Sequence, residues 1–262
     1  MKILLVNDDG IQAKGIRALV DAFKEEHEVY VSAPAAQKSG FSHCVTFFHD
    51  KIKVTEEYIE GAVKAWAVDG TPADCTYLGI FALMKEKPDV VISGINHGPN
   101  LSSDCTYSGT VGAALEGMMA NIPSMAVSLC SFTEDYFQQA ASVAKAILPV
   151  FMSSEERCNY VLNVNVPAIP LEEIKGIKVT RLDVPRKYTQ DFHQEENEDG
   201  SITISCVSFP DDSAFKEGIE DGDITATRNG YVSVTPLYED MCHHDVRKSI
   251  FSFENIKISY CI

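Results

Sequence analysis

The sequence lacks an uninterrupted apolar stretch of the length needed to cross a membrane, which is about 20 residues. Its N-terminal apolar run extends only from Ile3 to Val6 and is soon followed by the charged Asp8. That run is also too short for the core of a signal peptide. We therefore expect a cytoplasmic protein without a membrane partner.

Positive charge is scarce in this chain. Its 22 Lys and Arg residues face 38 Asp and Glu residues, and the formal net charge is −16 at pH 7. Nucleic-acid polymers and anionic membranes are bound mainly through Lys and Arg, so this composition argues against both as partners. An anionic substrate would need a local source of positive charge, and a bound metal ion is the simplest one.

Closely paired cysteines are missing as well. None of the eight cysteines belongs to a C-x-x-C pair of the kind found in redox and zinc sites. Scattered cysteines are typical of reduced thiols in a cytosolic protein.

Several common motifs of nucleotide-binding proteins and hydrolases are absent. The sequence contains no G-x-x-x-x-G-K-[ST], no G-x-G-x-x-G after a strand and no G-x-S-x-G. These absences argue against a P-loop nucleotidase, a dinucleotide-binding protein and a serine hydrolase.

The D-x-D-G-T motif of phosphatases with an aspartate nucleophile is incomplete. In that register, Asn7 replaces the first Asp and Ile11 replaces the Thr. Because the nucleophile is missing, direct attack by a metal-bound water is the better mechanism. A phosphatase that forms an aspartyl-phosphate in an unusual register remains an alternative.

Strands and amphipathic helices alternate through the first two thirds of the chain. Ile3 to Val6 is typical of a strand buried on both faces, the stripe from Ile16 to Phe23 indicates a helix, and Val29 to Ser32 indicates a second strand. This order predicts an α/β fold with a doubly wound, mostly parallel sheet. We expect one domain over residues 1–262, with the core in about 1–167 and a β-rich C-terminal extension in about 168–262.

The remaining expected elements follow from local patterns. Thr71 and Pro72 begin a helix that reaches about Met84, and a strand at Asp89 to Ser93 breaks into a loop at Gly94. An inserted β-hairpin or meander uses Val45 to Phe48, Ile52 to Thr55 and Val63 to Val68. The extension contains strands at Ile177 to Leu182, Ile202 to Val207 and Gly230 to Val234, and an exposed polar excursion at Gln190 to Ser201.

Four oxygen-bearing side chains follow three strands of the expected sheet. Asp8 and Asp9 come after the first strand, Ser39 after the second and Asn96 after a later one. Ligands bind outside the carboxyl ends of such strands, and hard oxygen donors favour Mg²⁺ or Mn²⁺ over zinc. The alternative is that Asn-Asp-Asp-Gly merely forms a tight turn.

A phosphate cradle is expected near the same edge of the sheet. Ser108, Gly109 and Thr110 lie at the start of a helix, where free backbone N–H groups bind anions. Asn100, in the loop before them, could donate its amide to a phosphoryl oxygen. Ser108 could instead be only an N-cap, and Asn100 only a turn residue.

A series of motifs in this chain resembles the SurE family of 5′/3′-nucleotidases, named for stationary-phase survival. The matching segments are Ile3–Ile11, Ser39–Gly40, Gly70–Cys75, Pro88–Asn96, Ser108–Ala114, Leu162–Pro167 and Gly230–Leu237. They occur in the family's order over nearly the whole chain. The chain departs from the family in having Lys14 where Pro is common, and Gly222-Asp223 as the counterpart of a Thr-Asp pair.

The resemblance implies a Rossmann-like core and hydrolysis of nucleoside monophosphates to nucleoside and phosphate. It implies one divalent cation per subunit, Mg²⁺ or Mn²⁺, bound by Asp8, Asp9, Ser39 and Asn96. It also implies a homodimer, or a homotetramer formed as a dimer of dimers, in which subunits exchange C-terminal segments.

The mechanism that we expect is in-line attack of an activated water on the phosphoryl group. Asp8 and Asp9 are the catalytic carboxylates, with Asp9 accepting the proton, while Asn100, Ser108, Gly109 and Thr110 hold phosphate oxygens. His97 could protonate the leaving oxygen, or it could be a solvent-facing loop residue. A non-catalytic nucleotide sensor that uses the same cradle is a further alternative.

Overall fold

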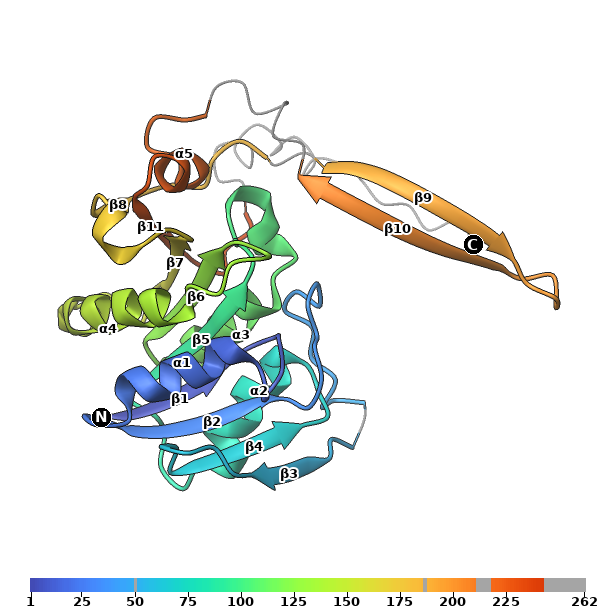
Figure 1. Ribbon diagram of the computed structural model, residues 1–262. Helices are drawn as coiled ribbons and strands as arrows, with labels where there is room; N and C mark the ends of the chain where they lie inside the picture. The colour runs from blue at the N-terminus through green and yellow to red at the C-terminus, as the bar shows by residue number, and fades with distance from the viewer. Residues whose placement is uncertain (50, 186–187, 211–217, 243–262) are drawn as a thin grey trace, which may run out of the picture.

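The computed structural model describes residues 1–49, 51–185, 188–210 and 218–242 (Figure 1). In these residues a nine-stranded sheet has the strand order β3-β4-β2-β1-β5-β6-β7-β11-β8. The strands of this sheet are β1 (Lys2–Val6), β2 (Glu28–Pro34), β3 (Val54–Glu57), β4 (Lys64–Val68), β5 (Val90–His97), β6 (Ser124–Cys130), β7 (Val161–Pro167), β8 (Ile177–Val179) and β11 (Val232–Leu237). The strands β9 (Tyr188–Glu196) and β10 (Ile202–Pro210) form a separate antiparallel ribbon.

The helices connect the strands of the main sheet. They are α1 (Lys14–Phe23), α2 (Pro72–Leu78), α3 (Gly109–Met119), α4 (Phe137–Ser153) and α5 (Asp223–Arg228). Three shorter segments are the π-helical η1 (Gly79–Leu83) and the 3₁₀ turns η2 (Ser102–Thr106) and η3 (Leu171–Glu173). Among the helices of the described residues, none is both long and apolar enough to span a membrane.

Six neighbouring strands, from β4 through β2, β1, β5 and β6 to β7, run parallel to one another. The predicted fold class, a mostly parallel doubly wound α/β sheet, is therefore confirmed. From β1 the chain builds outward to β2 and β4, and then returns to add β5, β6 and β7 on the other side. The order reverses between β1 and β5, which is where such sheets form their ligand crevice.

The strand β1 is buried on both faces because helices cover both sides of the sheet. Ile3 and Leu5 pack in one apolar cluster with residues of α1 and α4. Leu4 and Val6 pack in a second cluster with residues of α2, η1 and α3. Successive strand residues point to opposite faces, so a continuous apolar run is what this position requires.

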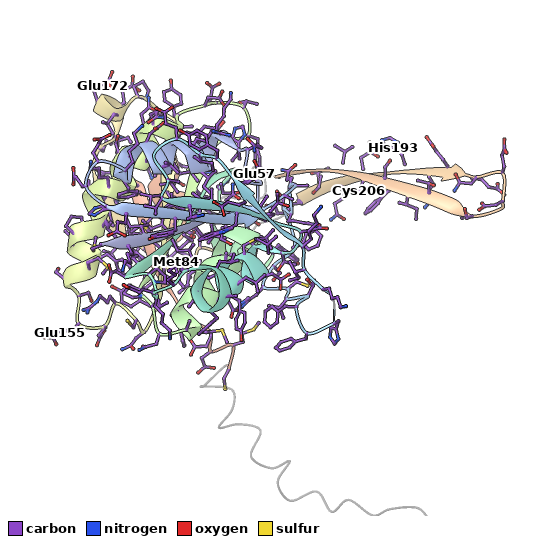
Figure 2. All side chains as sticks on the ribbon, turned by 90° about the horizontal axis from the view of Figure 1, so that it is seen from below. Glu57, Met84, Glu155, Glu172, His193 and Cys206 are labelled. Atoms are coloured by element: carbon purple, nitrogen blue, oxygen red, sulfur yellow. The ribbon has the colours of Figure 1, made fainter. Side chains whose placement is uncertain are left out.

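The β-rich extension has two parts. β11 pairs antiparallel with β7, and β8 pairs with β11, so both strands continue the main sheet. The ribbon of β9 and β10 instead projects from the body (Figure 1), and Figure 2 shows the side chains of His193 and Cys206 well away from it. The predicted boundary near residue 167 thus divides a continuous sheet, and residues 243–262 of the extension lie outside the described residues.

The excursion at Gln190 to Ser201 is exposed as predicted, but most of it is regular. Residues up to Glu196 belong to β9, which pairs along its full length with β10. The strand could not be predicted from this polar sequence. Both faces of the ribbon are exposed, so apolar and polar residues do not alternate along it. The helix α5 is a further element that the sequence pattern did not predict.

The expected strand at Val45 to Phe48 is wrong, although the hairpin of β3 and β4 is present. The backbone N–H and hydroxyl of Thr46 donate to the Asp74 carboxylate at 2.8 and 2.6 Å, and the Phe47 ring stacks on Tyr77. These contacts fix the segment against the start of α2. Its β-branched and aromatic residues therefore pack on a helix and not on a neighbouring strand.

The strand β5 does not end at Gly94 as the sequence suggests. Asn96 and His97 still pair with Ser128 and Leu129 of β6, after a register shift that follows Ser93. Gly94 has φ +143°, and a Cβ there would lie 2.3 Å from the carbonyl oxygen of Val127. This glycine therefore permits an irregularity inside the strand, and Asn96 stays fixed in the sheet.

Every cysteine in the described residues is a free thiol, while Cys261 lies outside them. Burial raises the pKa of the Cys75 and Cys105 thiols, so both are protonated and unreactive at neutral pH. They act as small apolar residues of the core.

Candidate active site

A cleft of about 470 Å³ opens at the carboxyl ends of β1 and β5. Its lining consists of Asp8, Ser39, Gly40, Asn96, His97, Pro99, Asn100, Asp104, Tyr107, Ser108, Phe132, Tyr188, Gln190 and Ser208. Five of the predicted site residues are in this lining, namely Asp8, Ser39, Asn96, Asn100 and Ser108. Asp9, Gly109 and Thr110 are not in this lining, but each lies against a lining residue, as described below.

The turn after β1 is closed by Asn7 and not by the aspartates. The Asn7 side chain donates to the carbonyl of Gly10 at 2.9 Å and accepts from its N–H at 3.2 Å. Gly10 has φ +98°, a conformation that suits glycine. The turn interpretation is therefore correct for Asn7 and Gly10, while the carboxylates of Asp8 and Asp9 are left for other contacts.

Asp8 is a buried carboxylate at the floor of the cleft, with only 3% of its surface exposed. The Thr110 hydroxyl donates to its Oδ1 at 2.6 Å. Burial raises the pKa of Asp8 to about 6; the Thr110 hydrogen bond opposes this shift, and the charge of Asp9 adds to it. A Cβ on Gly109 would lie 2.9 Å from the Cβ of Asp8, so the first turn of α3 packs closely against this aspartate.

Asp9 is oriented by the end of β5. The backbone N–H of His97 donates to its Oδ2 at 3.0 Å. Burial raises the pKa of Asp9, and the contact with His97 partly offsets the effect. The Asp8 carboxylate thus contacts the start of α3 and the Asp9 carboxylate contacts the end of β5, and neither has a Lys or Arg partner among the described residues.

Ser39 and Asn96 contribute neutral oxygen atoms. Gln37 donates to the Ser39 hydroxyl at 3.1 Å. The Asn96 amide donates to the carbonyl of Gly98 at 2.7 Å, which fixes the side chain and leaves its Oδ1 without a hydrogen-bond donor in the described structure.

This set of donors fits a hard divalent cation. Two unpaired carboxylates, a hydroxyl and an amide oxygen are the ligand types that Mg²⁺ and Mn²⁺ prefer. Within the described ranges, no group of three or more His, Cys, Asp and Glu side chains could hold a metal by itself. A site here therefore depends on Ser39 and Asn96 as well as on the aspartates.

Ser108 is the N-cap of α3, and it also lines the cleft. Its hydroxyl accepts from the N–H of Val111 at 3.0 Å, which is the capping contact. The N-cap interpretation is therefore correct, and it is compatible with anion binding because the start of the helix faces the cleft.

The structure places Thr110 differently from the sequence prediction. Its side chain is fully buried, and its hydroxyl is committed to Asp8. The hydroxyl therefore positions a carboxylate, whereas the prediction of a phosphate contact now falls on the backbone N–H groups of this turn.

Asn100 is held by two asparagines that sequence reasoning missed. Asn163 and Asn165 of β7 donate to its carbonyl at 2.9 and 3.0 Å, and Asn165 also accepts from its N–H at 2.8 Å. The Asn100 amide donates to Ser128 at 2.8 Å. The signal was present in the sequence, since two asparagines at alternate positions of an apolar strand lie on one face and need buried partners.

A second polar network holds the loop between β5 and α3 at Ser102. Asp223 accepts from the N–H groups of Asp183 (3.1 Å) and Ile224 (2.8 Å) through Oδ1, and from the N–H of Ser102 (2.8 Å) through Oδ2. Ser102 begins η2, between Asn100 and Ser108. The loop that contains Asn100 and leads to Ser108 is thereby tied to α5.

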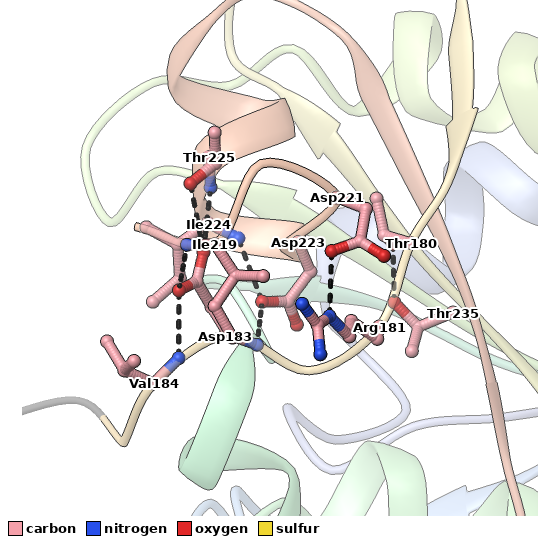
Figure 3. A network of polar contacts seen from close by, with 10 residues as sticks. All are labelled: Thr180, Arg181, Asp183, Val184, Ile219, Asp221, Asp223, Ile224, Thr225 and Thr235. Atoms are coloured by element: carbon pink, nitrogen blue, oxygen red, sulfur yellow. Dashed lines mark hydrogen bonds and ion pairs between the residues drawn. The ribbon is translucent and has the colours of Figure 1, made fainter. Parts of the chain in front are cut away.

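Asp183 organises the same network from the other side (Figure 3). Its carboxylate accepts from the N–H groups of Val184, Ile219 and Thr225 and from the Thr225 hydroxyl, at 2.8 to 3.3 Å. A Cβ on Gly222 would lie 2.1 Å from Asp183 Oδ2, so this carboxylate requires the glycine beside it.

The fold and the cleft define a doubly wound α/β protein with an oxygen-donor ligand site at the switch point of its sheet. A helix N-terminus at the same place suits an anionic ligand such as phosphate. The chain belongs to the SurE family, because the family model described as "Survival protein SurE" matches residues 3–189.

Relatives with curated names match nearly the full chain. The 5′-nucleotidase SurE of Pelotomaculum thermopropionicum is 41% identical over 95% of this chain and 94% of its own. The 5′/3′-nucleotidase SurE of Cronobacter sakazakii is 41% identical over 94% of each chain. The crystal structure of the Sure protein from Aquifex aeolicus matches with a TM-score of 0.81 at 39% identity, over 97% of this chain and 100% of that one. The family resemblance drawn from the motifs is thus confirmed.

Proposed function

We propose that this chain is a metal-dependent nucleotidase that hydrolyses nucleoside 5′-monophosphates, and also 3′-monophosphates, to nucleoside and phosphate. The observation that carries the proposal is that Asp8, Ser39 and Asn96 share one cleft with the N-terminus of α3. The names of the SurE relatives support the choice of substrate.

Asp8, Asp9, Ser39 and Asn96 would hold one Mg²⁺ or Mn²⁺ in this cleft. When bound, the cation would withdraw charge from the phosphoryl group and acidify the attacking water. Among the described residues that line the cleft there is no Lys or Arg, so the positive charge opposite the phosphate would come from the cation and from the helix N-terminus.

The side chains around the cation have separate tasks. Ser108, the N–H groups of Gly109 and Thr110, and the Asn100 amide would hold phosphoryl oxygens as charge develops on them. Asp9 would accept a proton from the attacking water, and the His97 N–H keeps its carboxylate in place. The Nε2 of His97 is buried without a hydrogen-bond partner in the described structure, and the ring packs on Phe137, so we give His97 no proton transfer in this mechanism.

Phosphate release tests this function directly. The wild-type protein should release phosphate from AMP, 3′-AMP and p-nitrophenyl phosphate with Mg²⁺ or Mn²⁺, and chelator should abolish the release. The Asp8→Asn variant should lose roughly a hundredfold or more in rate, because a charged ligand of the transition state is removed. Asp21→Asn, which removes an exposed carboxylate on α1, is the matched control and should leave the rate unchanged.

Two results would replace this mechanism. Tight binding of AMP without phosphate release under any metal condition would indicate a nucleotide sensor. A phosphorylated protein trapped by acid quench would indicate an aspartyl-phosphate intermediate.

We also propose that the chain forms a homodimer or homotetramer through its β-rich C-terminal segment. The projecting ribbon of β9 and β10 supports this, because it exposes Phe192, Ile202 and Ile204. Such a ribbon has little stability alone and gains from packing on another surface.

A further inference from the structure

We propose that the cleft contains a stacking site for the nucleotide base, formed by Phe132, Tyr107 and Tyr188. The proposal rests on the function proposed above and adds the feature of the substrate that the cleft recognises beyond its phosphate. Each of the three aromatic side chains lines the cleft that holds Asp8 and Ser108.

The three side chains are unusually exposed for their size. Tyr107 is 68% exposed, Phe132 is 65% exposed and Tyr188 is 39% exposed. They come from three different parts of the chain: the end of η2, the loop after β6 and the start of β9. Exposed aromatic residues that converge on one polar cleft are a ligand-binding surface, because their apolar faces gain when a ligand covers them.

Phe132 lies next to the cation-binding residues. A Cβ on Gly98 would lie 2.4 Å from Cε1 of the Phe132 ring, so the ring packs directly on the backbone two residues after Asn96. Its loop is also held in shape, since the Ser131 hydroxyl accepts from the N–H groups of Thr133 and Glu134 at 3.0 and 2.8 Å. The ring therefore has a defined position beside the phosphate site.

The other two rings line the cleft from the end of η2 and from the start of β9. Tyr107 directly precedes Ser108, and its carbonyl accepts from the N–H of Ser42 at 3.0 Å. Tyr188 and Gln190 lie on the same face of β9, and Ser208 is the partner of Gln190 on β10. All three side chains of that ribbon face line the cleft, so the base of the ribbon forms one of its walls.

The chemistry of this surface indicates how the base is recognised. A cleft of about 470 Å³ is of the size that binds a whole small molecule and not only a phosphate. Aromatic side chains bind the faces of bases, which every base offers, so stacking tolerates different bases. We therefore expect purine and pyrimidine monophosphates to be accepted, and sugar phosphates without a base to bind more weakly.

The test compares AMP with ribose 5-phosphate, which has the same sugar and phosphate but no base. Phe132→Ala should lower kcat/KM for AMP roughly ten- to a hundredfold, mainly through KM, and change the value for ribose 5-phosphate less than threefold. Phe132→Tyr should retain the AMP value. The matched control is Phe48→Ala, because Phe48 is 74% exposed and does not line the cleft; it should change neither substrate.

Equal losses for AMP and ribose 5-phosphate would overturn the stacking site, and so would an unchanged KM for AMP. A change of oligomeric mass in Phe132→Ala would also overturn it, because the ring would then serve a subunit contact. Tyr188→Ala gives a second measurement from another segment, with the same expected preference for AMP.

Failure of the nucleotidase function gives a different result. If the wild-type protein releases no phosphate, calorimetric titration of AMP and ribose 5-phosphate with Mg²⁺ present still tests the stacking site. Weaker binding of AMP alone by Phe132→Ala would support stacking in a protein that is not a nucleotidase. Equal affinities of the wild-type protein for the two ligands would reject it.

Discussion

At the scale of single residues, the turn after β1 divides two tasks between adjacent side chains. Asn7 bonds both polar groups of the Gly10 backbone and so forms the turn by itself. Asp8 and Asp9 are therefore not needed to shape the backbone. Their charges remain available to a cation, at the cost of burying two like charges side by side.

Thr110 is expected to act on catalysis through Asp8. Its hydroxyl donates a hydrogen bond to a buried carboxylate, and such charge-assisted bonds contribute about 1.5–3 kcal/mol. Thr110→Val should therefore lower kcat/KM for AMP roughly ten- to a hundredfold. Thr110→Ser keeps the hydroxyl and should retain most activity. Equal activity of the Val and Ser variants, with unchanged melting temperatures, would contradict this role.

The gathering of Asp8, Ser39 and Asn96 in one cleft could be predicted from the sequence, but the contacts that support these residues could not. Asp8 and Ser39 follow parallel strands and Asn96 lies in the last residues of one, and the geometry of such sheets places the three together in the cleft. The contact between Thr110 and Asp8 joins residues 102 positions apart, and it depends on how closely α3 packs against β1. The spacing of residues along the chain does not indicate how closely these two elements pack.

At the scale of elements, the loop from β5 to α3 is fixed at two points that belong to distant strands and helices. β7 holds it through Asn163 and Asn165, and α5 holds it through Asp223. This loop, which contains the 3₁₀ turn η2, is thus held to the rest of the fold by buried side chains that bond its backbone groups.

We expect Asp223→Asn to weaken the attachment of this loop to α5. The carboxylate accepts three backbone N–H groups, whereas an amide has one oxygen and would turn its NH₂ group toward a donor. The free energy of unfolding should fall by about 1–3 kcal/mol in urea titrations. Asp221→Asn makes the same change in an exposed ion pair and should stay within about 0.5 kcal/mol of wild type. Similar losses in both variants would rule out a special role for Asp223.

The elements themselves were predictable to different degrees. The parallel strands and the long helices have continuous apolar runs or stripes, and the structure confirms them. The ribbon strand β9 was missed because both its faces are exposed. The helix α5 was missed because it has only six residues and its buried positions include the polar Asp223 and Thr227. The prediction of a strand at Val45 to Phe48 was wrong because the apolar side chains of this segment pack on α2.

At the scale of the whole molecule, the ribbon of β9 and β10 sets the expectation for assembly. Phe192 and Ile204 lie on the same face of the ribbon, since Phe192 pairs with Cys206 and Ile204 with Gln194. Light scattering during size-exclusion chromatography should give the mass of a dimer or tetramer. Ile204→Glu should reduce that mass, because it places a charge in the apolar contact.

Thr203→Glu is the control for this substitution. It adds the same charge to the neighbouring position, which points to the other face of the ribbon, and should leave the mass unchanged. A monomer at every concentration of the wild-type protein would contradict the proposed assembly.

The absence of Lys and Arg among the described residues of the cleft also determines how a substrate reaches it. A chain with a net charge of −16 repels a nucleotide in solution, and no basic side chain among the described lining residues would guide the nucleotide inward. Dissolved ions shorten the range of this repulsion. At a fixed, saturating Mg²⁺ concentration, kcat/KM for AMP should therefore increase when ionic strength rises from about 10 to 150 mM, whereas enzymes that attract their substrates slow down.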